Sequence, residues 1–356
     1  MIKICTVVGA RPQFIKVAPV SRELNFFAHE VLIHTGQHYD ENMSDVFFRQ
    51  LGLPVPAYNL EIGSGKHGAQ TGEMLKKIEE VLLTEKPDGV LVYGDTNSTL
   101  AGALAASKLH LPIFHVEAGL RSFNRRMPEE INRVLTDHLS SLLFAPTGAA
   151  IRNLSNEGLT KGVHQVGDVM YDAVLHNAQI AEETSSVLRQ LDLTSGTFVL
   201  ATIHRAENTD DVQRLTAIWE GLQAIPMPVV LPMHPRTKNI IHDLGLPSSS
   251  SNLHVIEPVG YFDMLQLEAN AYAIITDSGG VQKEAYFMKK PCLTVREETE
   301  WVETVDLGWN TLVQASKSDI LNKFEALPRM NRSEHQPVYG DGKAAQSIAS
   351  VIKAFF

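Results

Sequence analysis

Cysteine, long apolar runs and a secretion signal are scarce or missing in this sequence, and each absence excludes a class of protein. The two cysteines, Cys5 and Cys292, lie far apart among 356 residues, which argues against a disulfide framework or a zinc knuckle and predicts buried thiols in a reducing compartment. No apolar stretch approaches the roughly 20 residues of a membrane helix. The first residues enter a strand pattern directly, without the apolar core of a signal peptide. We therefore expect a cytoplasmic protein with no membrane partner.

Positive charge is also in short supply. The formal net charge is −10 and the isoelectric point is near 5.8, which argues against a nucleic-acid partner.

The turn after the first predicted strand lacks G-x-G-x-x-G, so a dinucleotide cofactor is disfavoured. No H-E-x-x-H, C-x-x-C or EF-hand spacing occurs, and His115 and Glu117, on one face of a strand, have no third ligand in range. The sequence predicts neither a cofactor nor a metal.

What the sequence does contain is a regular alternation of short apolar runs with segments of helical period. Such alternation is typical of βαβ units in a parallel sheet, and 356 residues exceed what one hydrophobic core usually supports. We predict an α/β protein of two Rossmann-like, doubly wound parallel-sheet domains with a central cleft, at residues 1–168 and 169–342. An amphipathic helix at residues 343–356 can pack back on the first domain. The expected strands are residues 4–8, 30–34, 89–92, 113–116, 142–144, 198–203, 228–232, 253–256 and 273–277.

Carboxylates follow two of these strands directly. Asp95 comes after the strand at residues 89–92, Glu117 comes after the strand at 113–116, and Glu129 opens the next helical segment. Ligands of open α/β sheets bind outside the carboxyl ends of the strands, so these three groups are expected to share acid and base work in one pocket. The sequence therefore predicts an enzyme.

A glycine turn between a strand and a helix predicts an anion site in the second half. Ser278, Gly279 and Gly280 expose backbone N–H groups at a helix start, and Glu284, about one turn later, can accept hydrogen bonds from a ribose diol. A plain glycine turn with a serine N-cap is the competing interpretation.

Cations and histidines occupy further strand ends. Arg11 and Lys16 follow the first strand and can meet a pyrophosphate, although Arg11 could instead cap a neighbouring element. His204 follows the strand at 198–203, where it can exchange a proton near neutral pH or simply bond its own loop. His234 follows the next strand, and we assign it to ligand binding.

Taken together, these motifs resemble those of the bacterial UDP-N-acetylglucosamine 2-epimerases of the non-hydrolysing type. The resemblance covers nearly the whole chain, and the order and spacing of the motifs make it specific. The motifs are Gly9-x-Arg11-Pro12-x-x-Ile15-Lys16, Gly94-Asp95-Thr96, His115-Val116-Glu117-Ala118-Gly119-Leu120-Arg121, Pro128-Glu129-Glu130-x-Asn132-Arg133, His204-Arg205-x-Glu207 and Asp277-Ser278-Gly279-Gly280-x-Gln282-x-Glu284.

The resemblance implies a GT-B-like fold, a homodimer, and interconversion of UDP-GlcNAc and UDP-ManNAc by elimination and re-addition of UDP, without a dissociable redox cofactor or essential metal. It implies a catalytic set of Asp95, Glu117, Glu129 and His204. The residues assigned to substrate and UDP binding are Arg11, Lys16, Gln37, His38, Arg133, Arg205, His234, Ser278, Gly279, Gly280, Glu284 and Arg296.

The sequence also departs from the best-known members of that family. Gln13 and Phe14 replace a Glu-Ala pair, and residues 34–40 and 299–303 differ as well. These variants are more similar to the branch that acts on UDP-2,3-diacetamido-2,3-dideoxy-glucuronate in O-antigen synthesis. The exact hexosamine is left open, as is activation by a second substrate molecule.

Three alternatives remain at this point. A hydrolysing relative would release UDP and free ManNAc from the same intermediate. A GT-B glycosyltransferase would share the fold and the UDP site but would need an acceptor, and three clustered carboxylates argue against it. A sugar-nucleotide-binding protein without catalysis would have no use for apposed acids and bases.

Overall fold

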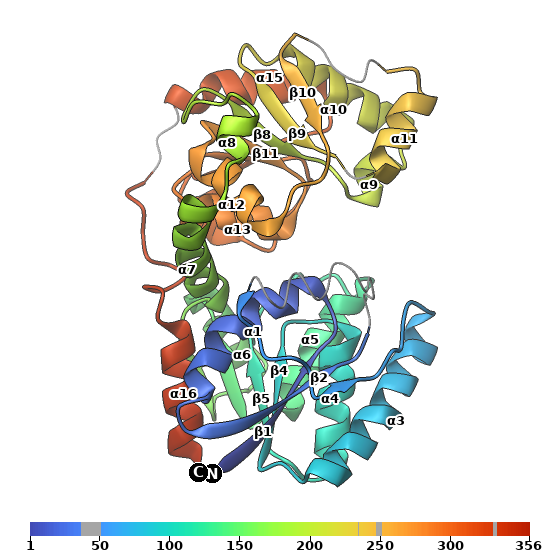
Figure 1. Cartoon of the computed structure of the whole chain (residues 1–356), viewed down its shortest axis with the longest axis vertical. Helices are drawn as coiled ribbons and strands as arrows, with labels where there is room; N and C mark the ends of the chain where they lie inside the picture. The colour runs from blue at the N-terminus through green and yellow to red at the C-terminus, as the bar shows by residue number, and fades with distance from the viewer. Residues whose placement is uncertain (37–50, 234, 247–250, 330–332) are drawn as a thin grey trace. The chain divides into compact units, whose positions relative to one another are not determined.

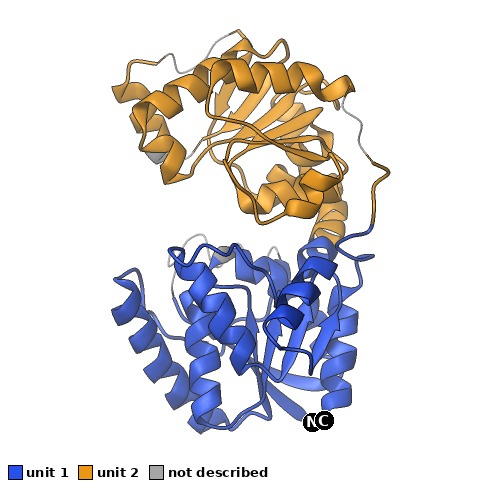
Figure 2. Ribbon diagram, turned by 180° about the vertical axis from the view of Figure 1, so that it is seen from behind, with its two compact units in different colours: residues 1–173, 337–356 blue, residues 174–336 orange. Residues whose placement is uncertain are grey.

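The chain divides into two compact units, each an α/β fold of its own (Figure 2). The computed structural model describes residues 1–36, 51–233, 235–246, 251–329 and 333–356. Unit 1 comprises Met1–Ala173 and Pro337–Phe356, and unit 2 comprises Val174–Gln336. The chain thus leaves the first unit shortly after residue 168 and returns to it before its last helix.

Unit 1 is built on a seven-stranded parallel sheet in the order β3-β2-β1-β4-β5-β6-β7. Strands β4, β5 and β6 are buried along their whole length, because helices cover both faces of the sheet (Figure 1). The strands are β1 (Ile2–Val8), β2 (Ala28–His34), β3 (Tyr58–Asn59), β4 (Gly89–Tyr93), β5 (Ile113–Val116), β6 (Leu142–Ala145) and β7 (Val163–Gln165).

The helices of unit 1 include one that returns from the end of the chain. Helix α16 packs against α1, and its first backbone N–H groups, those of Ala344 and Ala345, donate to the Asp172 carboxylate at 3.1 and 2.8 Å (Figure 1). A carboxylate at a helix N-terminus satisfies N–H groups that have no partner within the helix. The helices are α1 (Arg11–Leu24), α3 (His67–Glu85), α4 (Asn97–Lys108), α5 (Pro128–Leu139), α6 (Gly148–Asn156), α16 (Ala344–Phe355) and α7 (Val169–Thr184), which continues into unit 2.

Unit 2 repeats the plan with a six-stranded parallel sheet in the order β10-β9-β8-β11-β12-β13. Its strands are β8 (Val199–Thr202), β9 (Val229–Pro232), β10 (Leu253–Ile256), β11 (Ala273–Thr276), β12 (Cys292–Thr294) and β13 (Asn310–Leu312). Its helices are α8 (Val187–Gln190), α9 (Ala206–Thr209), α10 (Val212–Ala224), α11 (Pro235–Asp243), α12 (Tyr261–Asn270), α13 (Gly279–Phe287), α14 (Val302–Asp306) and α15 (Lys317–Ala326), followed by a 3₁₀ turn at Leu327–Arg329.

The strand order sets where each unit can bind a ligand. In unit 1, β2 and β3 lie on one side of β1, and the next strand along the chain, β4, lies on its other side. In unit 2, β9 and β10 lie on one side of β8, and β11 lies on its other side. At such a switch point the loops after neighbouring strands diverge to opposite faces and leave a crevice at the carboxyl ends. Asp95, His204 and Ser278 lie two residues beyond β4, β8 and β11, and Lys16 lies in α1, the helix that follows β1.

The sequence located the longer strands correctly but missed short ones. Strands β3, β7 and β13 have two or three residues each, too few to show a periodic pattern, and only pairing with a neighbour defines them. Cys5 and Cys292 are both buried and free, and burial raises the pKa of each thiol to about 12. Within the described ranges, no helix is both long and apolar enough to cross a lipid bilayer.

Candidate functional site

At the switch point of unit 1, a lysine and a glutamate meet beside Asp95. Strand β4 ends in Gly94, which turns the chain with a φ of 65°, and Asp95 follows. The Glu117 carboxylate pairs with the Lys16 ammonium, and a Cβ placed on Gly94 would lie 3.3 Å from Glu117 Oε2. The structure therefore brings Lys16, Glu117 and the Asp95 turn together, and a side chain at position 94 would crowd the Glu117 carboxylate.

Glu117 is held in an unusual conformation. Its φ of 74° lies in the left-handed region, and its side chain is only 6% exposed. For a residue with a Cβ this conformation costs about 1–2 kcal/mol, and such strain gathers at functional sites. The Lys16 ion pair offsets part of the cost of burying the carboxylate.

Helix α5 holds Asp95 from the other side. Arg133 donates to Asp95 Oδ2 from Nη2 at 2.7 Å and from Nε at 3.0 Å, and Asn132 donates to the Asp95 carbonyl at 2.8 Å. Burial works against the charge of Arg133, but Asp95 and the nearby Glu130 outweigh it and raise the pKa of the guanidinium. Arg133, predicted to bind substrate, is thus a fixed cation that orients a partly exposed carboxylate.

The two adjacent glutamates of α5 have different surroundings. Glu130 is buried and accepts hydrogen bonds from Ser122 N at 2.8 Å, Ser122 Oγ at 3.0 Å and Phe123 N at 3.0 Å. Burial alone would raise the pKa of Glu130, but these donors and Arg133 hold it below its ordinary value. Glu129 lies in the exposed first turn of the helix. Its catalytic assignment stays a prediction.

A buried glutamine joins the two strands that flank the switch point. The Oε1 atom of Gln13 accepts from Gly9 N at 2.8 Å and Ala10 N at 3.0 Å, while its Nε2 donates to the Tyr93 carbonyl at 2.8 Å. A glutamate could accept the first two bonds but could not donate the third. The departure at position 13 therefore fits the local geometry.

In unit 2, a buried aspartate organises the loop that carries His204. Asp277 accepts from the backbone N–H groups of His204 and Arg205 and from the Asn208 amide, all at 3.1 Å, and lies 3.3 Å from His204 Nδ1. Its side chain is fully buried, whereas that of His204 is 54% exposed. Sequence reasoning gave Asp277 no role, although its place directly after β11 was the available signal.

The glycine turn after Asp277 is braced on two sides. Ser278 caps α13 by accepting from Val281 N at 3.5 Å, and the Trp301 indole donates to the Gly279 carbonyl at 2.8 Å. A Cβ on Gly279 would lie 3.9 Å from Arg205 Nη2. A helix N-terminus with half-buried glycines and a guanidinium beside it can bind an anion.

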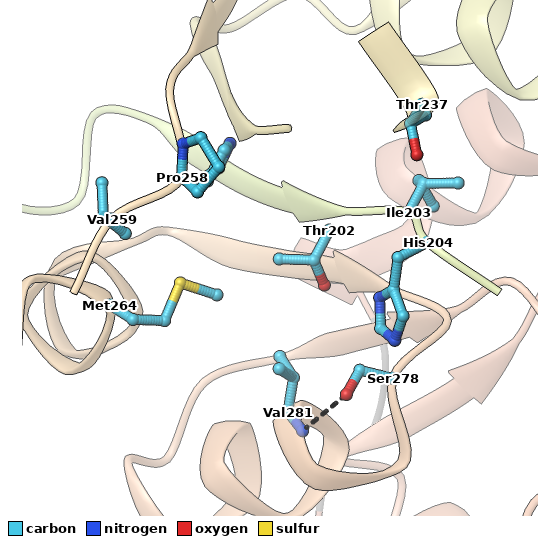
Figure 3. Close-up of a pocket in the computed structure, with 10 residues that line it drawn as sticks. Thr202, Ile203, His204, Thr237, Pro258, Val259, Met264, Ser278 and Val281 are labelled. Atoms are coloured by element: carbon cyan, nitrogen blue, oxygen red, sulfur yellow. Dashed lines mark hydrogen bonds between the residues drawn. The ribbon is translucent and has the colours of Figure 1, made fainter. Parts of the chain in front are cut away.

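A cavity of about 470 Å³ opens beside this turn (Figure 3). His204 and Ser278 lie on one side of it, and Val259 and Met264 lie on the other. Its size and its mostly apolar lining suit a small organic ligand. The lining residues are Thr202, Ile203, His204, Pro232, Thr237, Pro258, Val259, Met264, Ser278 and Val281. Most of them were missed, although residues 257–260 follow β10 at the same edge of the sheet.

Glu284, predicted to bind a ribose, lies beside a second buried carboxyl group. Glu268 of α12 is fully buried, and neither of its oxygens has a donor within the described residues. Burial first, and the neighbouring Glu284 carboxylate second, raise the pKa of Glu268 well above its ordinary value. Burial and Glu284 thus favour the protonated form of Glu268, which can donate to Glu284.

The buried Glu268 carboxyl beside Glu284 makes the free energy of unfolding depend on pH. Below about pH 4.3 Glu268 is protonated in both states. Above it the unfolded state loses the proton first, because folding raises the pKa of Glu268, so stability falls by up to about 1.4 kcal/mol per pH unit until the folded state also ionises. We expect Glu268→Gln, which cannot ionise, to gain stability relative to wild type as the pH rises above about 5 in urea unfolding. Glu257→Gln, at an exposed carboxylate, is the control and should show no such divergence. Parallel curves for wild type and Glu268→Gln would contradict the assignment.

Other predicted binding residues are engaged or lie outside the described part of the chain. Arg296 is buried in an ion pair with Glu300, with bonds of 2.9 and 3.2 Å. Burial would raise the pKa of Glu300, but the Arg296 guanidinium holds it below its ordinary value. Gln37, His38 and His234 lie outside the described residues, and Arg11 is described only as the first residue of α1.

Comparison with known proteins identifies the family. A family model described as UDP-N-acetylglucosamine 2-epimerase matches residues 22–353. A UDP-N-acetylglucosamine 2-epimerase homolog of Methanococcus maripaludis is 54% identical over 99% of both chains. The UDP-2,3-diacetamido-2,3-dideoxy-D-glucuronate 2-epimerase of Pseudomonas aeruginosa is 52% identical over 98% of this chain and 99% of its own. The crystal structure of Methanocaldococcus jannaschii UDP-GlcNAc 2-epimerase, in complex with UDP-GlcNAc and UDP, is 46% identical, covers 99% of this chain and 100% of its own, and has a TM-score of 0.88.

These likenesses confirm three of the predictions. The fold class is confirmed, since the similar solved structures share the GT-B-like fold of two Rossmann-like units. The prediction of an enzyme is confirmed, because the matched proteins are isomerases that act on nucleotide sugars. The resemblance found in the motifs is confirmed over almost the full length. This chain belongs to the UDP-N-acetylglucosamine 2-epimerase family.

Proposed function

We propose that this protein is a non-hydrolysing 2-epimerase of a UDP-N-acetylhexosamine. It interconverts UDP-GlcNAc and UDP-ManNAc, or the corresponding UDP-2,3-diacetamido-2,3-dideoxy-glucuronate and -mannuronate. The observation that carries the proposal is the strained, lysine-paired Glu117 carboxylate over the Asp95 turn. The names of its relatives, which include both substrate types at 52% and 48% identity, support the choice of substrates.

The chemistry explains why several acid and base groups are needed. A C2–H beside an acetamido group is weakly acidic, so removal of its proton accompanies departure of UDP from C1. The C2–H and C1–O bonds break, the C1=C2 bond of a 2-acetamidoglucal forms, and the leaving oxygen of UDP takes an electron pair. Re-addition of UDP with protonation on the opposite face of C2 gives the epimer. Two proton-transfer groups are therefore required, one for each face.

The residues divide into two functions under this proposal. Asp95, Glu117 and Glu129 of unit 1 exchange the C2 proton, with His204 of unit 2 assisting proton transfer at the leaving group. The cavity beside Ser278 holds the nucleoside, and the glycine turn with Arg205 holds the diphosphate. We expect Arg205 and the backbone N–H groups of the glycine turn to contribute mainly by electrostatic stabilisation of the departing diphosphate.

We further propose a homodimer and a role in cell-surface polysaccharide or O-antigen synthesis. The resemblance to the diacetamido-glucuronate branch supports the role. Exposed apolar side chains on α5, Ile131 at 41% and Leu135 at 44%, supply a surface for self-association. Light scattering of the purified protein measures its mass, and a value near 39.3 kDa would rule out the dimer.

The deciding experiment is proton NMR of the purified protein in D₂O, with UDP-GlcNAc and UDP-2,3-diacetamido-glucuronate in separate samples. We expect deuterium at C2 and growth of the manno epimer with the true substrate, because the carboxylates exchange their proton with solvent before returning it. Accumulation of UDP and free ManNAc would identify a hydrolysing enzyme instead. Absence of exchange with both nucleotides would overturn the elimination mechanism and favour a glycosyltransferase.

A further inference from the structure

A histidine and an aspartate lie directly beneath the carboxylates of unit 1. His115, in β5, contacts Asp137 Oδ1 through Nδ1 at 2.7 Å and the Gly94 carbonyl through Nε2 at 2.8 Å. Both side chains are fully buried. The sequence had left His115 as one half of an incomplete metal site, but its two nitrogens are both engaged by protein groups.

Both nitrogens of the His115 ring face hydrogen-bond acceptors. Because a carboxylate and a carbonyl can only accept, each nitrogen is placed to donate. Arg121 Nη1 lies 2.8 Å from Asp137 Oδ2, and Glu157 pairs with Arg121 at 2.7 Å, so His115 and Arg121 hold Asp137 from two sides. Burial opposes the ionisation of Asp137, but the His115 bond and the Arg121 guanidinium hold its pKa below the ordinary value.

The pair reaches both turns that carry the acid and base groups. Gly94, whose carbonyl His115 binds, immediately precedes Asp95. Asp137 Oδ2 also accepts from the N–H of Gly119 at 3.1 Å, two residues beyond Glu117. Gly119 has a φ of 81°, and a Cβ there would lie 2.5 Å from the Ala150 carbonyl oxygen, so this turn approaches α6 closely and admits no side chain at position 119.

We infer that the His115–Asp137 pair is a positioning device that sets the separation between the Asp95 and Glu117 carboxylates. This inference rests on the proposed function, since it assigns the pair to the geometry of those two groups. Neither residue touches the substrate. Because a displacement of about 1 Å in a reacting group costs on the order of a hundredfold in rate, a rigid link between the two turns affects turnover more than binding.

Two substitutions separate the two bonds of the ring. The amide nitrogen of glutamine occupies the place of Nε2, so His115→Gln keeps the donor to Gly94, whereas the asparagine amide occupies the place of Nδ1 and His115→Asn loses it. We expect kcat to fall by about 10–100-fold in His115→Asn with KM little changed, and to recover by about tenfold in His115→Gln. His110→Asn, at an exposed histidine of the loop that precedes β5, is the matched control.

The outcomes distinguish positioning from a purely structural role. Equal kcat in folded wild type and His115→Asn, with only a lower melting temperature, would overturn the inference. A second readout does not depend on activity: in ¹⁵N-labelled protein, we expect the backbone amide signal of Asp95 to move in His115→Asn and to return toward its wild-type position in His115→Gln. An unmoved signal in His115→Asn would also overturn the inference. If wild type fails to epimerise either nucleotide sugar, the proposed function is wrong, and the amide signal still decides whether His115 holds the Gly94 turn.

Discussion

Replacing Glu117 by glutamine, or Asp95 by asparagine, is expected to lower turnover by about a thousandfold while UDP affinity changes by less than about twofold. Under the proposed function each substitution removes a proton-transfer group, whose contribution is typically about 10²–10⁴-fold. Both residues belong to unit 1, whereas the cavity and the anion-binding turn belong to unit 2, so nucleotide binding should persist. The measurements are initial rates of C2 epimerisation and calorimetric titration with UDP.

The control for this experiment lies at the opposite end of the same strand. Asp88 precedes β4 as Asp95 follows it, and it accepts only the Lys3 backbone N–H at 2.8 Å among the described hydrogen bonds. Asp88→Asn should leave both rate and affinity unchanged. Rates near wild type in both Glu117→Gln and Asp95→Asn would refute the assigned roles, and loss of UDP binding in folded variants would contradict the assignment of nucleotide binding to unit 2.

Replacing Asp277 by asparagine is expected to have the largest effect on nucleotide binding. Its carboxylate accepts from His204 N, Arg205 N and the Asn208 amide at the base of the cavity. An asparagine can accept on one side only, and its own N–H groups would face donors, at a cost of about 1–3 kcal/mol for each buried group left unpaired. We expect UDP to bind more than about tenfold more weakly and the melting temperature of the protein to fall.

The matched control for Asp277 is an exposed aspartate of the same loop. Asp210 ends α9 and contacts Thr209 Oγ1 at 3.3 Å. We expect Asp210→Asn to bind UDP as wild type does. Titrations are made at a temperature where circular dichroism shows each variant folded. An Asp277→Asn protein with unchanged UDP affinity would contradict the view that this carboxylate shapes the site.

The contrast between these two experiments tests the division of labour between the units. We expect Glu117→Gln to lose turnover but still bind UDP, and Asp277→Asn to lose UDP binding. That pair of results would support chemistry in unit 1 and nucleotide recognition in unit 2. If Glu117→Gln weakened UDP binding as much as Asp277→Asn does, that division would be wrong.

Local patterns in the chain were enough to predict the parallel α/β architecture and the strand ends that carry Asp95, Glu117, His204 and the glycine turn after Asp277. These features depend on local signals: apolar runs of strand length, helical periodicity between them, and glycines where the chain must turn. The rule that ligands bind at the carboxyl ends of parallel strands then needs no knowledge of which strands are neighbours.

How those groups are held could not be predicted in this way. Asp137, and not Glu117, is the partner of His115, Glu130 is buried while Glu129 is exposed, and Arg296 pairs with Glu300. Folding also brings Glu268 beside Glu284 and forms the cavity from four separate strand-end loops. These outcomes depend on contacts between residues far apart in the chain and on the burial those contacts create, and neither is encoded in the spacing of a motif.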